Sequence, residues 1–113
     1  MKFTASDLRA GYAFLKRLAF SNDCRLPAAR SVDFVAKALK AHGYHGLTEG
    51  RHCIWVDTTD TTSLDMMLRI LAHEMLHVAL GHGHVPPSYA HGTDFKEAAR
   101  AIEQEMGWPK GSV

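Results

Sequence analysis

Two helices are predicted in the first part of the chain, where apolar side chains recur at every third or fourth position. The first covers residues 6–20, with Ser6 as its N-cap. The second covers residues 31–42, with Ser31 as its N-cap, and ends at Gly43. The apolar faces of the two helices consist of Leu8, Tyr12, Leu15 and Ala19, and of Phe34, Val35, Ala38 and Leu39. Each helix can therefore bury one face in a shared core.

The chain then changes to short runs of β-forming residues separated by glycines. We predict two strands, over residues 44–48 and 52–57, because the segment HCIWVD is rich in residues that favour strands. A tight turn at Glu49 and Gly50 would join them as a hairpin. The predicted sheet is therefore small and follows the two helices.

Helical spacing returns in the last part of the chain. A third helix is predicted to start at the capping-box pattern TSLD, with Thr62 as its cap, and to run to Gly81. A fourth covers residues 94–106, with Thr93 as its cap, and ends at Gly107. The order of two helices, a short sheet and two more helices predicts an α+β fold.

The length and composition are those of one folded domain. The chain has 113 residues, of which 46% are hydrophobic and 22% charged, so we treat residues 1–113 as a single domain and as a monomer. No stretch approaches the ~20 apolar residues of a membrane span, and the N-terminus lacks the pattern of a secretory leader. We therefore expect a cytoplasmic protein without a membrane partner. Cys24 and Cys53 form no C-x-x-C pair, and we expect free thiols.

Charge is unevenly distributed along the chain. Residues 1–40 carry eight Lys or Arg against three acidic residues, whereas residues 41–113 carry five against nine. A basic first third is compatible with a surface that faces nucleic acid. The alternative is a set of ordinary solvated helices, because the basic residues are dispersed and no aromatic-basic motif accompanies them.

The segment HEMLH carries the H-E-x-x-H pattern of metal-dependent hydrolases. On a helix, His73 and His77 lie one turn apart on the same face, so both imidazoles can bind one metal ion at about 2 Å. Glu74 is then turned aside toward a bound water. The strongest apolar stripe of this helix consists of Leu64, Leu68, Leu71, Met75 and Val78, on the other side. The pattern therefore predicts a metal site on a buried helix.

The pattern leaves open which residue is the third ligand. The candidates are His82, His84 and His91. Metzincins place a histidine ten residues after the first and a glycine seven residues after it. Those positions hold Gly83 and Leu80 here, so this register fails.

A second motif begins at His91, in the segment HGTDFK. HEMLH, a spacer and HGTDFK together resemble the SprT-like family of zinc metallopeptidases, whose pattern is H-E-x-x-H followed by H-G-x-x-F-K. The preceding IWVD strand and the helix that leads into LAHEMLH are also similar to that family, so the resemblance covers about residues 44–106. Many members carry a cysteine zinc ribbon after this domain. The residues after 106 contain no cysteine, so the chain resembles a minimal form.

The resemblance implies a small zincin-like fold, Zn²⁺ as the cofactor and Glu74 as the catalytic acid/base. The zinc ligands that it implies are His73, His77 and His91. Gly92 would allow the turn into the last helix, and Phe95 would pack that helix under the active helix. The family includes proteases that act on DNA-associated proteins. This implies a protein or peptide substrate and an association with DNA or DNA-bound proteins.

The predicted function is hydrolysis of peptide bonds by metal-activated water, with Glu74 as the general base. We expect the strand 52–57 to lie along the cleft and to pair with an extended substrate. Tyr89 is a candidate to donate a hydrogen bond to the oxyanion, and a plain loop aromatic is the alternative.

Two other functions fit the same metal site. A zinc hydrolase that acts on RNA would use the basic residues 1–40 to hold the phosphate backbone. A non-catalytic zinc-binding module would have His82 or His84 as a fourth protein ligand, because closed tetrahedral zinc sites are structural. The substrate and the number of protein ligands distinguish the three functions.

Overall fold

Three helices and a three-stranded sheet make up the described part of the chain. The computed structural model describes residues 1–20, 25–81 and 91–113. In chain order, the elements are α1 (Ala5–Leu18), a 3-10 turn (Ala29–Ser31), β1 (Asp33–Lys37), β2 (Gly43–Thr48), β3 (Arg51–Asp57), α2 (Leu64–Ala79) and α3 (Thr93–Met106). The predicted α+β fold class is confirmed.

The sheet has the strand order β1-β3-β2, with β1 parallel and β2 antiparallel to β3. The predicted hairpin of β2 and β3 is confirmed. Its turn consists of Glu49 and Gly50, which both have positive φ angles, of 53° and 79°. Two such residues twist the chain in the sense that matches the twist of the flanking strands. The turn thereby sets the register from Gly43 opposite Val56 to Thr48 opposite Arg51.

The predicted helix over residues 31–42 is wrong, because this segment contains strand β1. Phe34 is buried and pairs with Ile54, whereas Asp33 and Lys37 are exposed. Neighbouring side chains of a strand point to opposite faces, which puts Phe34 in the core and Asp33 on the other face. The apolar run was too short to distinguish the two periods by itself. Pairing with β3, about 20 residues further along the chain, satisfies the backbone as a parallel ladder.

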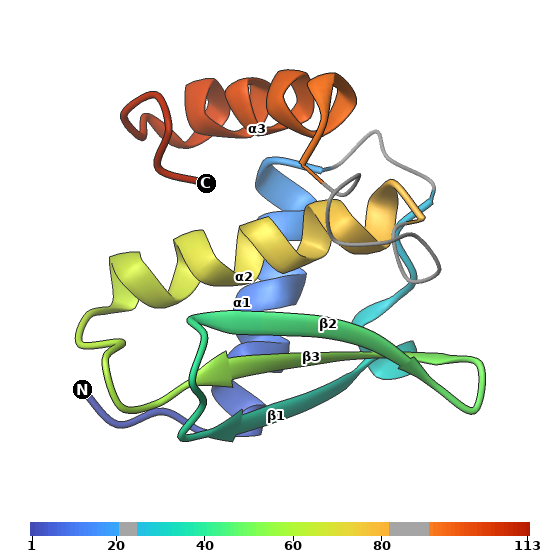
Figure 1. The fold of residues 1–113 in the computed structure, drawn as a ribbon, viewed down its shortest axis with the longest axis vertical. Coiled ribbons are helices and arrows are strands. Elements are labelled where there is room, and N and C mark those ends of the chain that lie inside the picture. Colours follow the sequence, from blue (N-terminus) through green and yellow to red (C-terminus); the bar gives the residue numbers. More distant parts are fainter. Residues whose placement is uncertain (21–24, 82–90) are drawn as a thin grey trace.

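The core lies between the sheet and helices α1 and α2, and α3 lies on the far side of α2 from the sheet (Figure 1). Tyr12 of α1 contacts Phe34 of β1 edge to face, with ring centroids 5.5 Å apart, and its hydroxyl donates to the Pro27 carbonyl. The largest apolar side chains that are fully buried are Tyr12, Leu8, Leu15, Ile54, Leu71 and Met75. Among the described residues, no helix is long and apolar enough to cross a membrane.

The first residues of the helices differ slightly from the prediction. The caps are Thr4, Ser63 and Gly92, in place of the predicted Ser6, Thr62 and Thr93. Thr4 has an extended backbone, accepts the Asp7 N–H on its hydroxyl, and donates its own N–H to the Asp7 carboxylate. This reciprocal capping box defines the start of α1. Gly107 ends α3 in the left-handed conformation, as predicted.

Candidate metal centre

Helix α2 directs two imidazoles to one point, because His73 and His77 are four residues apart. Their Nε2 atoms lie 3.2 Å apart. His77 is buried, with 8% of its surface exposed, and His73 is half-buried. The opposite face of α2 is anchored in the core by Leu71 and Met75, which are fully buried. Core packing therefore fixes the rotation of the helix that presents the two rings.

The third imidazole comes from the residue before the N-cap of α3. His91 Nε2 lies 3.1 Å from Nε2 of His73 and 3.1 Å from Nε2 of His77. Gly92 follows with an extended backbone and turns the chain into α3. The structure thus brings together the three histidines that the two sequence motifs single out, and they could hold a metal ion.

The spacing of the three nitrogens fits a small metal ion. On a tetrahedral ion with nitrogen ligands at about 2.0–2.1 Å, two ligand nitrogens are about 3.3–3.4 Å apart. The observed separations are 3.1–3.2 Å. Three neutral imidazoles that point their lone pairs at one another at this distance repel unless a cation or a proton lies between them. The three nitrogens are therefore arranged to share one cation or one proton that lies between them.

Electrostatics favour the neutral form of His73. Burial lowers the pKa of His73 to about 4, and the neighbouring His91 acts in the same direction. A hydrogen bond to the backbone of Val113 opposes the shift. Because metal binding requires a neutral imidazole, the low pKa keeps the ligand competent at neutral pH.

Phe95 supports the three rings from α3. Its ring centroid lies 4.9 Å from that of His73, 4.8 Å from that of His77 and 5.0 Å from that of His91. Only 4% of Phe95 is exposed. The aromatic ring therefore limits the rotation of all three imidazoles and excludes water from one side of the site.

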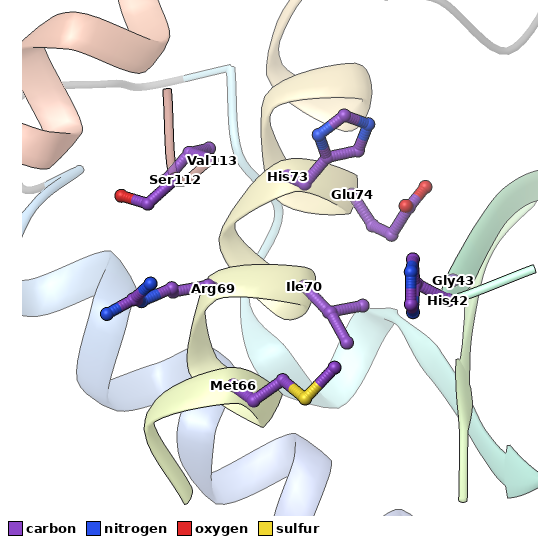
Figure 2. A pocket seen from close by; sticks show the side chains of 9 residues that line it. All are labelled: His42, Gly43, Met66, Arg69, Ile70, His73, Glu74, Ser112 and Val113. Atoms are coloured by element: carbon purple, nitrogen blue, oxygen red, sulfur yellow. The ribbon is translucent and has the colours of Figure 1, made fainter. Parts of the chain in front are cut away.

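Glu74 follows His73 on α2, and its side chain lies on the side of the helix that faces the start of β2 (Figure 2). Only 6% of Glu74 is exposed. Burial raises the pKa of its carboxyl group to about 7. A carboxyl group with such a pKa can accept and release a proton near neutral pH.

No family model, curated protein or solved structure matches the chain. The resemblance to the SprT-like family therefore stays a prediction from the segments HEMLH and HGTDFK. The chemistry of the site has to be argued from the chain's own residues.

A groove runs along the exposed side of α2 from the ligand histidines toward the start of the helix (Figure 2). Its floor consists of Met66, Arg69 and Ile70, and His73 and Glu74 lie at its inner end. One wall is the start of β2, at residues 42–43, and the other is residues 112–113. The reactive groups therefore open into a defined space.

The segment after α3 folds back to form this second wall, so that Val113 lies between α3 and α2 (Figure 1). The Trp108 indole N–H donates to Asp65 of α2 over 3.0 Å, and the Val113 N–H donates to Glu103 of α3 over 2.9 Å. Glu103 is buried, with 2% exposed. These two hydrogen bonds hold the segment against both helices.

The expectation that the strand 52–57 borders the cleft is wrong. This strand is β3, which lies in the middle of the sheet and pairs with β1 and β2 on its two sides. The strand next to Glu74 is β2, over Gly43–Thr48. The error follows from the missed strand β1, which occupies the side of β3 that the predicted two-stranded hairpin left open.

Several residues considered from the sequence fall outside the described ranges. They are His82 and His84 as fourth ligands, Tyr89 as an oxyanion donor, and Cys24 as a free thiol. Cys53, the other cysteine, is a free, buried thiol as expected, and burial raises its pKa.

Of the residues that line the groove, only His73 and Glu74 were identified from the sequence as functional. Gly43, Met66 and Ile70 are among those that were not. The predicted helix over residues 31–42 gives Gly43 no role except to end that helix. A glycine at the start of a strand is a signal of close backbone approach, and in that role it could have been recognised.

Proposed function

We propose that the protein is a zinc-dependent metallopeptidase that hydrolyses peptide bonds of a protein substrate. The observation that carries this proposal is the convergence of three Nε2 atoms within 3.2 Å of one another, one residue away from a buried carboxyl group. Three protein ligands with a neighbouring acid/base are the usual set of a catalytic zinc site, whereas structural sites have four protein ligands.

The donor set supports zinc. Imidazole nitrogens suit zinc, and the spacing of the three atoms is close to that of a tetrahedral site. Bound zinc would polarise the scissile carbonyl and lower the pKa of a water toward ~7. His73, His77 and His91 would hold the ion, and Phe95 would keep their rings in place.

Glu74 supplies the proton transfers in this proposal. Its carboxylate accepts a proton from the attacking water and then passes it to the nitrogen of the leaving amine. Burial raises its pKa to about 7, which is close to the pH at which a general base of this kind would act. Glu74 lines the groove, so its carboxyl group would lie next to a substrate bound there.

Strand β2 offers a binding edge for an extended peptide. Within the described ranges, β2 pairs with β3 alone, so its outer edge carries backbone N–H and C=O groups that no other described strand covers. The strand begins at Gly43, beside Glu74. A substrate added to this edge would pass the reactive groups in extended form, which is the conformation that peptidases commonly bind.

The SprT-like resemblance extends the proposal to the nature of the substrate. It favours a protein that is bound to DNA, and the excess of basic residues over residues 1–40 is compatible with that partner. Part of this charge has a structural role, because the Arg9 guanidinium lies over the Phe34 ring at 5.1 Å. The RNA hydrolase would need the basic residues 1–40 to hold the phosphate backbone, so the structural role of Arg9 also lowers the support for that function.

The test compares the zinc-loaded wild type with Glu74→Gln on an unfolded protein and on labelled RNA. We expect the wild type to cut only the protein. Glu74→Gln should keep one zinc per chain and lose hydrolysis by about 10²- to 10⁴-fold. Undiminished proteolysis by the variant would contradict the mechanism. RNA cleavage alone would establish the other hydrolase, and zinc without either activity would establish a binding module.

A further inference from the structure

The groove along α2 continues the face of the helix that carries the metal ligands. Ile70 and Met66 lie three and seven residues before His73, which places them on the same side of the helix. Both side chains are half-buried and line the groove. Two aliphatic side chains beside a ring of imidazoles form an apolar surface next to a polar centre, which is the usual make-up of a ligand site.

The space in this groove depends on Gly43. A Cβ at this position would lie 2.8 Å from Ile70 Cγ2 and 3.2 Å from the Trp55 carbonyl oxygen, so any other residue would press on the floor of the groove. With glycine there, the groove has a volume of about 360 Å³. That value is within the range of roughly 300–1,000 Å³ for small-molecule sites.

The one basic side chain on the groove floor is held by other groups. The Arg69 guanidinium forms an ion pair with Asp65 at 2.6 Å and lies over the Trp108 ring at 5.9 Å. Its charge is therefore engaged at the side of α2 away from Gly43, as Figure 2 shows. The groove floor next to Glu74, at Ile70 and Met66, is therefore apolar.

We propose that this groove is a subsite for an aliphatic side chain of the substrate, with Met66 and Ile70 as the residues that determine specificity. The inference rests on the proposed function, since it uses the metal centre as the anchor for the reacting group. A substrate held at the centre would place the side chain of a residue next to the scissile bond on Ile70, and a longer side chain would reach Met66. The enzyme would therefore prefer leucine-like or methionine-like residues there over acidic ones.

The test uses two hydroxamic acids that share a metal-binding group and differ in chain length. Acetohydroxamic and hexanohydroxamic acid are titrated calorimetrically into the zinc-loaded wild type. Four additional methylene groups should tighten binding by on the order of 10- to 100-fold if they are buried in the groove. Ile70→Asn and Met66→Asn should each remove most of this gain, measured within each variant as the ratio of its affinities for the two acids. The matched control is Leu64→Asn, at a position on α2 that is 58% exposed and lies outside the groove, and it should keep the full gain.

Each outcome supports or overturns the subsite. Equal affinity of the wild type for the two acids, or an undiminished gain in both groove variants, overturns it. If Ile70→Asn fails to fold or to bind zinc, Ile70→Ala decides instead, and its gain must fall several-fold. Chain-length discrimination in a protein that cuts no peptide would keep the subsite and reject the peptidase. If the wild type binds no zinc, or binds zinc but not acetohydroxamic acid, both the subsite and the metallopeptidase proposal are rejected.

Discussion

Gly43 of β2 and Glu74 of α2 are in direct proximity, although 31 positions separate them in the sequence. A Cβ at Gly43 would lie 3.0 Å from Glu74 Oε2, closer than almost any Cβ lies to a neighbouring atom. The strand can therefore approach the carboxyl group only because residue 43 has no side chain. This contact contributes to the burial of Glu74, and burial is the cause of its raised pKa.

Gly43→Ala should disturb Glu74 without removing the metal ligands. The added methyl group must displace Ile70, Glu74 or the strand, and we expect a loss of about 1–3 kcal/mol in the free energy of unfolding. Peptide hydrolysis should fall, and the zinc content should stay at one per chain. The control is Gly46→Ala, since a Cβ there would meet mainly the movable Tyr44 ring, at 3.1 Å. Equal losses in the two variants would show that Gly43 has no special relation to Glu74.

Alanine at any histidine of the triad should lower the zinc content of the protein. Each Nε2 lies 3.1–3.2 Å from the other two, so removal of one leaves a site with two protein ligands. A ligand that binds only the folded state stabilises it, so a chelator should lower the Tm of the wild type and have little effect on His73→Ala, His77→Ala or His91→Ala. His42→Ala, at an exposed position outside the triad, is the control. Metal content is measured by mass spectrometry. Full zinc binding by His91→Ala would exclude His91 as a ligand.

Phe95→Ala should affect both the fold and the metal centre. Removal of this buried ring is expected to cost about 3–5 kcal/mol in stability, as is typical of Phe→Ala in a core. The three imidazoles lose their common contact, and metal affinity should fall roughly 10- to 100-fold, as for other residues that support ligands. The control is Phe14→Ala, which removes a phenylalanine ring from a position that is 40% exposed. It should lower neither the stability nor the zinc affinity by a comparable amount. Chemical denaturation and competition with a zinc-binding dye measure the two effects. If Phe95→Ala folds and binds zinc with unchanged affinity, Phe95 does not hold the three imidazoles in place.

Stability should depend on acid pH through Asp57, at the end of β3. Its carboxylate accepts the N–H groups of Leu39 and Asp60, each over 2.8 Å. These hydrogen bonds lower its pKa, so the folded protein holds the proton less tightly than the unfolded chain does. The stabilisation is therefore complete above the ordinary pKa of an aspartate and is lost as the pH falls through the lowered value.

Asp57→Asn tests this dependence. In metal-free protein, the Tm of the wild type should exceed that of Asp57→Asn at pH 6, and the difference should shrink as the pH is lowered below about 4. Other titrating groups are common to both proteins and cancel in the difference. Glu105→Gln, at an exposed position of α3, is the control and should follow the wild type. A difference that stays constant with pH would mean that the Asp57 charge does not stabilise the fold.

Local features of the chain were predictable. The helix α2 follows from its apolar period, and the i, i+4 spacing of His73 and His77 then fixes their common face. The turn at Glu49 and Gly50 also needs only local information, because its conformation is set by the two residues themselves. The predicted positions of the helix caps were less accurate. Several polar residues near each start can accept the same N–H groups, and packing decides among them.

The sequence by itself therefore determined that His73 and His77 share one face of a helix, whereas it left the third ligand open among three histidines and pointed to His91 only through the resemblance at HGTDFK. Only the tertiary structure decided that residues 33–37 form a strand, that β2 borders Glu74, and that Gly43, Ile70 and Met66 shape a groove beside the histidines. The physical reason is the range of the interactions. Helical spacing and tight turns act over a few residues, whereas strand pairing and the approach of β2 to α2 join segments about 20 to 30 residues apart.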